Sequence, residues 1–306
     1  MSQNTTKKKS GVGYCIRLLL LLAELLAVAL FLWGNDVYSL SAATPEFKWE
    51  NYETIAHALG GISDKTYLNS KESFLANYQM GCRLFEVDLT KTSDGVWVCR
   101  HSWTQPMGQW EGDKARVLSE AEFLSSPIYR KYTPMTLADF LKLLKNYPDA
   151  FVMLDSKQYS VRSYQTTVED YADYLEIAEA AGAEEVLDQI IPEIYTQPMF
   201  AGTALLYNFP TYIYSLWQEY SVKDLKEIAA FCREKGIPAA TVYYKYWSED
   251  VQDIFDKKGI KLYIYTVNDL KEAKEYMQKG AAGICSDYLQ DRDLNLDKKD
   301  IDKHEN

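Results

Sequence analysis

Cysteine and histidine are scarce in this sequence, which has five cysteines and three histidines among 306 residues. No two cysteines form a C-x-x-C pair; they stand at Cys15, Cys82, Cys99, Cys232 and Cys285. A structural zinc site needs paired ligands at short spacing, and a disulfide framework needs a dense set of cysteines. The sequence therefore predicts neither a zinc site nor a disulfide scaffold.

Basic side chains are also few, with 33 lysines and arginines against 44 acidic residues and a net charge of −11. Residues 1–43 carry four basic and two acidic side chains, so the rest of the chain has a net charge of −13. Proteins that bind nucleic acid neutralise phosphates with lysine and arginine. The acidic body therefore argues against a nucleic-acid partner.

Long hydrophobic runs are absent except at residues 18–33, where Glu24 is the single polar residue and four basic residues precede the run. At about 1.5 Å per residue the run spans ~24 Å, less than a hydrocarbon core of ~30 Å. We interpret residues 1–43 as an export signal peptide, or as a signal anchor that ties the protein to a membrane if uncleaved. The basic flank stays cytoplasmic, so the rest of the chain is expected to be extracytoplasmic, either membrane-anchored or secreted.

The remaining body, residues 44–290, contains 247 residues, close to the ~250 of a single (β/α)8 barrel. Short apolar runs typical of strands occupy residues 54–58, 84–90, 151–155, 189–194, 204–207, 239–243, 261–266 and 283–286. Amphipathic segments typical of helices alternate with them at residues 70–80, 136–146, 167–181, 222–235, 248–257 and 270–279, with a possible seventh at 211–220. This alternation predicts an α/β fold of the TIM-barrel type.

Two segments of the body do not fit the repeating pattern. Residues 102–133 are rich in tryptophan, glutamine, glycine, serine, proline and charge, and are too long for an ordinary connection. We expect an inserted loop whose aromatic residues cap a pocket, touch a bilayer or pack together. Residues 291–306 alternate both charges with few apolar residues, and we expect a polar, disordered tail.

Glu86 and Asp88 lie two residues apart in the strand-like segment 84–90. Because side chains alternate along a strand, both carboxylates share one face, which would point into the barrel. Two carboxylates on a buried face are costly, so either they bind a cation or they lie at the wet end of the strand. An edge strand with a solvated polar face is the alternative.

A second strand-like segment ends in Asp155, and Lys157 follows two residues later on the same side. Barrel enzymes place their chemistry at the carboxyl ends of strands. Three carboxylates from two strands would form an all-oxygen site, which suits Mg²⁺ or Ca²⁺. Taken alone, Asp155 also fits a helix N-cap.

His57 and His101 each follow a strand-like run, whereas the third histidine, His304, lies in the tail. Two histidines that flank two carboxylates form an arrangement suited to general acid–base catalysis. A single histidine at a strand end is more often structural, so the joint placement is what favours catalysis.

Several of these segments resemble a known family. The sequences IAHALGG from Ile55, GCRLFEVDLT from Gly81, SDGVWVCRH from Ser93, MLDSK from Met153 and GICSDY from Gly283 resemble, in order, those of glycerophosphodiester phosphodiesterases. That family is part of the phosphatidylinositol phospholipase C-like phosphodiesterase superfamily. The likeness runs from about Ile55 to Leu289.

The resemblance implies a distorted TIM barrel that hydrolyses glycerophosphodiesters or phospholipid headgroups with one divalent cation, Mg²⁺ or Ca²⁺. By this likeness His57 and His101 would be the acid–base pair, and the cation ligands would be Glu86, Asp88 and Asp155. Lys157 would contact the phosphate. Tyr265 takes the place of a family tryptophan and would form an aromatic wall or pack in the barrel core, and Glu193 would contact substrate or be solvated.

The sequence departs from the family pattern in three places. Ala58 follows the first histidine where an arginine is usual, Tyr67-Leu68 replaces Pro-Glu before Asn69, and Asp155 replaces glutamate. These departures leave two alternatives: a catalytically weak barrel that binds headgroups or glycans, and a sphingomyelinase D-like or phospholipase C-like phosphodiesterase. A third alternative is a glycosidase that uses Glu86 and Glu193 as its pair of carboxyl groups, which would need no metal.

Overall fold

The computed structural model describes residues 45–112, 114–157 and 164–294. The segment interpreted as an export signal or anchor, residues 1–43, lies outside these described residues. Within the described residues, no helix combines the length and apolar character needed to cross a bilayer.

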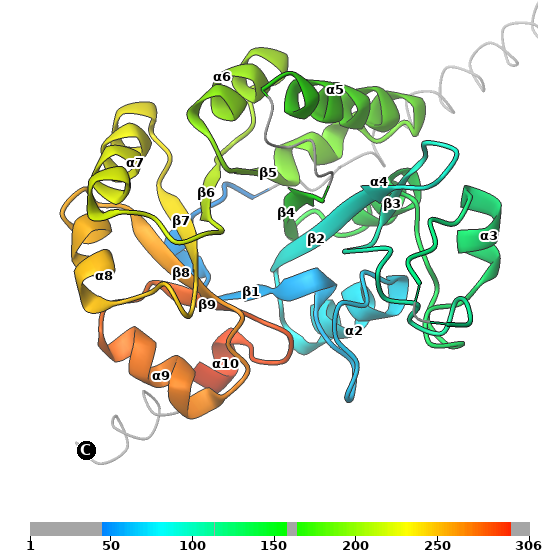
Figure 1. Ribbon diagram of the computed structural model, residues 1–306, viewed down its shortest axis with the longest axis horizontal. Helices are drawn as coiled ribbons and strands as arrows, with labels where there is room; N and C mark the ends of the chain where they lie inside the picture. Colours follow the sequence, from blue (N-terminus) through cyan, green and yellow to red (C-terminus); the bar gives the residue numbers. More distant parts are fainter. Residues whose placement is uncertain (1–44, 113, 158–163, 295–306) are drawn as a thin grey trace, which may run out of the picture. The chain divides into compact units, whose positions relative to one another are not determined.

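Eight parallel strands close into a barrel (Figure 1). They are β1 (Thr54–Ala56), β2 (Leu84–Lys91), β4 (Phe151–Ser156), β5 (Ile190–Ile194), β6 (Ile213–Leu216), β7 (Ala239–Tyr243), β8 (Lys261–Tyr265) and β9 (Gly283–Ser286). Consecutive strands pair around the ring, and β1 closes it by pairing with both β2 and β9. A short ninth strand, β3 (Trp97–Cys99), runs antiparallel to the end of β2. The predicted TIM-type barrel is confirmed.

The helices lie outside the ring of strands (Figure 1). They are α2 (Lys71–Met80), α3 (Glu120–Ser125), α4 (Leu137–Leu144), α5 (Tyr164–Ala180), α6 (Gln197–Leu206), α7 (Val222–Lys235), α8 (Glu249–Asp256), α9 (Leu270–Gln278) and α10 (Asp291–Leu294). Short 3-10 turns are η1 (Trp49–Asn51), η2 (His57–Leu59) and η4 (Glu184–Gln189). The largest apolar cluster contains strand residues such as Phe85 and Val87 together with helix residues such as Phe74 and Phe140.

The prediction of a strand at residues 204–207 is wrong, because most of that segment belongs to α6. Thr196 caps this helix by accepting a hydrogen bond from the Met199 N–H, and a proline lies in its first turn. The fifth barrel strand is β6, which lies inside the stretch 211–220 that was predicted as a possible helix. A short apolar run is compatible with either a buried helix or a strand, so periodicity alone could not decide.

The first four residues of the predicted tail are part of the folded barrel domain. Residues 291–294 form α10, and the Asp291 carboxylate accepts a 2.6 Å hydrogen bond from the Thr54 hydroxyl at the start of β1. The rest of the predicted tail, residues 295–306, lies outside the described residues.

The barrel interior changes from apolar to polar along the strands. Near the amino ends, inward residues such as Leu84, Phe151 and Ile213 pack into one cluster, which Trp49 of η1 joins. Two or four residues later on the same faces come Asp88, Asp155 and Ser215. The acidic residues predicted for the site therefore gather at the carboxyl end of the barrel.

Candidate active site

A cavity of about 400 Å³ opens at the carboxyl end of the barrel. Seven of the eight predicted site residues line it: His57, Glu86, His101, Asp155, Lys157, Glu193 and Tyr265. The eighth, Asp88, is fully buried next to them. Strand ends separated by more than 200 residues in the sequence thus form one site, as the barrel prediction required.

The three carboxylates converge because of the strand register. Asp88 of β2 lies directly opposite Asp155 of β4, and neighbouring parallel strands are only about 4.8 Å apart. Ligand oxygens of Glu86, Asp88 and Asp155 all lie within 4.8 Å of one another, and all three residues are buried. Neither the solvated edge strand nor the simple N-cap describes these residues.

The donor set fits a hard divalent cation. One Glu86 oxygen accepts a 2.6 Å hydrogen bond from the Ala58 N–H, whereas Oε1 is buried without a hydrogen-bond partner among the described residues. Burial, together with the charge of Asp88, raises the pKa of Glu86 well above its usual value. A buried, unpartnered carboxylate oxygen beside two further carboxylates matches the all-oxygen coordination of Mg²⁺ or Ca²⁺.

Lys157 supplies the positive charge that balances these carboxylates. Its ammonium forms ion pairs with Asp155 and, at 3.0 Å, with Asp88 Oδ1. Although burial opposes both charged forms, Lys157 and the two histidines hold the pKa of Asp88 down at about 2. The same carboxylates, against the effect of burial, raise the pKa of Lys157 well above its usual value. Lys157 is therefore a fixed cation at the edge of the cavity.

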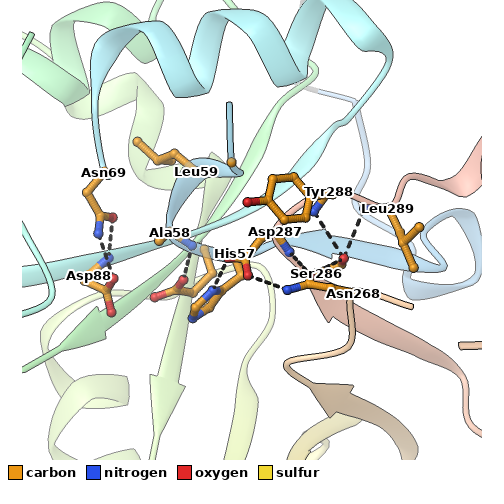
Figure 2. Close-up of polar contacts among 12 residues, drawn as sticks. His57, Ala58, Leu59, Asn69, Asp88, Asn268, Ser286, Asp287, Tyr288 and Leu289 are labelled. Atoms are coloured by element: carbon orange, nitrogen blue, oxygen red, sulfur yellow. Dashed lines mark hydrogen bonds and ion pairs between the residues drawn. The ribbon is translucent and has the colours of Figure 1, made fainter. Parts of the chain in front are cut away.

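Asn69 fixes Asp88 from the other side, a role that the sequence did not assign. Its side-chain amide donates a 2.7 Å bond to Asp88 Oδ2 and accepts a 3.0 Å bond from the Asp88 N–H (Figure 2). Asn69 is fully buried. Asn69 could have been singled out because it matches the asparagine of the family pattern. Only the fold shows that its side chain binds Asp88 of β2.

Asp287 binds His57 and was not predicted as a site residue. His57 Nδ1 lies 2.8 Å from Asp287 Oδ1, and both side chains are largely buried (Figure 2). Asn268 donates a 2.7 Å bond to the other oxygen of Asp287 and accepts a 2.8 Å bond from its N–H. This arrangement fixes the orientation of the His57 ring and supplies a carboxylate to its Nδ1.

His101 reaches the site because the chain reverses after β2. Strand β3 returns along β2, and the Arg100 N–H donates a 2.9 Å bond to the Asp88 carbonyl. His101 Nδ1 is buried and has no hydrogen-bond partner among the described residues. Burial lowers the pKa of His101. The lowered pKa favours the neutral imidazole, which can accept a proton.

The opposite wall of the cavity comes from β5 to β8. Glu193 is only 6% exposed, so the solvated interpretation is wrong. Burial, with the nearby charge of Asp155, raises the pKa of Glu193 to about 8. Tyr195 donates a hydrogen bond to Asp155. Tyr265 lines the cavity and also packs against the apolar cluster inside the barrel.

The insert of residues 102–133 packs mainly on itself. Trp103 and Phe123 are buried in a small cluster with Val98 of β3. The buried Arg100 guanidinium donates hydrogen bonds to the Ser102 and Gln105 carbonyls and to the Gln109 side chain. Among the described residues of the insert, none lines the cavity.

Comparisons with known proteins agree with this geometry. Residues 61–291 match the model of the glycerophosphoryl diester phosphodiesterase family. No curated protein matches the sequence.

Solved structures share the fold at low sequence identity. A phosphodiesterase from Oleispira antarctica, in complex with its product sn-glycerol-3-phosphate, has a TM-score of 0.62 and 16% identity, covering 80% of this chain and 96% of that one. A glycerophosphodiester phosphodiesterase from Parabacteroides distasonis gives 0.61 and 16%, covering 83% and 98%. One from Thermotoga maritima gives 0.57 and 19%, covering 81% and 97%.

The family match covers most of the barrel, including His101 and all three carboxylates, whereas His57 lies just before its first residue. The prediction of a phosphoric diester hydrolase is thereby confirmed. The chain belongs to the glycerophosphoryl diester phosphodiesterase family.

Proposed function

We propose that this protein is an exported, metal-dependent phosphodiesterase that cleaves glycerophosphodiesters or phospholipid headgroups by acid–base catalysis between His57 and His101. The observation that carries the proposal is the convergence of both histidines on three carboxylates whose oxygens lie within 4.8 Å of one another. A cavity of about 400 Å³ is within the range of small-molecule sites.

The two histidines differ in their surroundings, and the difference suggests their roles. His101, whose pKa burial lowers, accepts the proton of the attacking hydroxyl, either of water or of a neighbouring group on the substrate. His57, hydrogen-bonded to Asp287, carries a proton and donates it to the leaving alcohol oxygen. A P–O bond to the attacking oxygen forms as the P–O bond to the leaving alcohol breaks. One proton moves from the attacking hydroxyl to His101, and one moves from His57 to the leaving oxygen.

The carboxylates Glu86, Asp88 and Asp155 would hold one Mg²⁺ or Ca²⁺ ion, which would neutralise charge on the phosphoryl oxygens when bound. The Lys157 ammonium lies 3.0 Å from Asp88 and would place a second positive charge beside the phosphoryl group. Tyr265 and Glu193 would contact the alcohol part of the substrate from the opposite wall.

The test is hydrolysis of a panel of phosphodiesters by the full chain, with Mg²⁺, with Ca²⁺ and with chelator. We expect metal-dependent release of an alcohol, lost in His57→Ala and in His101→Ala. Turnover that survives chelator contradicts the metal proposal. No turnover on any diester, in wild type and variants alike, would favour the alternative of a headgroup- or glycan-binding barrel.

The nature of the product separates the remaining alternatives. Attack by water gives a phosphomonoester, whereas attack by a neighbouring hydroxyl of the substrate gives a cyclic phosphate, and ³¹P NMR of the reaction distinguishes the two. Choline release from sphingomyelin or lysophospholipid would identify a sphingomyelinase D-like enzyme, and diacylglycerol release a phospholipase C-like one.

The proposed location rests on the leucine-rich run at residues 18–33 and on the basic residues before it. Protease added to intact cells should digest the barrel of an anchored, outward-facing protein, and the culture medium should contain it if the signal is cleaved. Full protection inside intact cells contradicts export.

A further inference from the structure

Tyr67 lies between the two histidines. Its ring centroid is 4.7 Å from that of His57 and 4.9 Å from that of His101, with interplanar angles of 81° and 66°. Edge-to-face packing at these distances is favourable. Tyr67 also lines the cavity. One aromatic ring thus contacts both groups to which the proposed function gives the proton transfers.

The backbone at Tyr67 has an unfavourable conformation. Tyr67 has φ 55° and Asn69 has φ 45°, a left-handed region that is unfavourable for residues with a Cβ atom. Such strain persists only where the surroundings fix it. Asn69 is locked to Asp88 by two hydrogen bonds, and the fully buried Leu68 packs against Met107 and Ile128 of the insert. The insert and β2 together therefore hold Tyr67 at the cavity.

The Tyr67 hydroxyl forms no hydrogen bond with the residues that the structure describes, although Asp88, Asp287 and Lys157 are near enough to act on its charge. Burial raises the pKa of Tyr67, so the hydroxyl stays protonated and can donate. Ala58 offers no side-chain donor beside His57, and its N–H is already bound to Glu86.

We propose that Tyr67 has two roles: its ring fixes the relative orientation of His57 and His101, and its hydroxyl donates a hydrogen bond to a phosphoryl oxygen of the bound diester. The inference rests on the proposed function. Paired proton transfer needs both imidazoles in a fixed geometry. A neutral donor adds to the stabilisation that Lys157 provides without changing the charge balance of the site.

Two variants separate the roles of the ring and the hydroxyl. Tyr67→Phe keeps the ring, so we expect KM to rise about tenfold, as for loss of a hydrogen bond to a charged group, while kcat changes less than about threefold. Tyr67→Leu removes both, so kcat should fall by a further factor of about ten or more. Tyr129→Leu is the matched control, because Tyr129 also has a left-handed φ of 50° but does not line the cavity.

Three results would contradict these roles of Tyr67. An unchanged KM in Tyr67→Phe overturns the role of the hydroxyl. A kcat for Tyr67→Leu equal to that of Tyr67→Phe overturns the role of the ring. A loss in Tyr129→Leu as large as that in Tyr67→Leu would mean that both act only through folding, which also overturns the inference.

A measurement that needs no turnover separates this inference from the proposed function. The chain has three histidines, so the imidazole NMR signals of His57 and His101 can be assigned with one alanine variant each. The Tyr67 ring should shift both signals, and Tyr67→Leu but not Tyr67→Phe should abolish these shifts. Unchanged signals in Tyr67→Leu overturn the contact, whereas a wild type that hydrolyses no diester refutes the proposed function alone.

Discussion

Replacement of Asp287 by asparagine tests the His57 dyad directly, because it keeps the shape of the side chain and removes its charge. Asp287 Oδ2 accepts a 2.7 Å bond from the Asn268 amide. In Asp287→Asn the amide oxygen should take that place, which leaves the new NH₂ group facing His57 Nδ1. Because this group donates, His57 must accept at Nδ1, so the doubly protonated imidazolium that its role as acid requires is disfavoured.

The expected magnitude follows from the burial of this pair. His57 and Asp287 side chains are 13% and 6% exposed and 2.8 Å apart. Loss of a charge-assisted hydrogen bond of this kind costs about 1.5–3 kcal/mol, or roughly 10- to 150-fold in kcat. The kcat falls because less of His57 carries the proton that it must donate to the leaving oxygen.

The assay compares kcat and KM of wild type and Asp287→Asn on the best diester of the panel, together with their thermal melting. Asp293→Asn is a suitable control, because the Asp293 carboxylate accepts a hydrogen bond from the Gln290 N–H rather than pairing with His57. We expect kcat to fall at least tenfold in Asp287→Asn and to stay unchanged in the control. A wild-type kcat in Asp287→Asn would refute the role given to the dyad.

Three further predictions concern neighbouring groups. Because burial lowers the pKa of His101 from 6.5, the acidic limb of kcat/KM should lie below pH 6.5, and a limb above that value would contradict its role as base. The pKa of Glu193, raised by burial to about 8 from 4.5, implies that stability falls as pH rises from 4.5 to 8, since only the unfolded chain ionises there. The melting temperature of Glu193→Gln should therefore exceed that of wild type by more at pH 8 than at pH 5, and an equal difference at both would argue against a protonated Glu193. Arg100→Leu leaves three acceptors of the insert unpaired and should lower the free energy of unfolding by about 3 kcal/mol in urea, whereas the exposed Arg116→Leu should change it little.

Much of the fold was predictable because each barrel strand carries its own signal. In β2 and β4 the inward positions change from Leu84 and Phe151 to Asp88 and Asp155, and period-two alternation places each set on one face. The misassigned pair, α6 and β6, lacked such a signal. Apolar residues 204–207 fit a helix or a strand equally well, and only the pairing of Ile213–Leu216 with β5 and β7 decided it.

By itself, the sequence determined the barrel, the acidic and histidine residues of the site and the chemistry they favour, because these depend on residue type and on spacing within single strands. Only the tertiary structure decided which distant residues complete the site. Asp287 joins His57 because β9 closes the barrel against β1. Tyr67 meets both histidines because Leu68 packs against the insert while Asn69 binds β2. Such contacts join residues 10 to 230 positions apart in the sequence, and no local pattern encodes them.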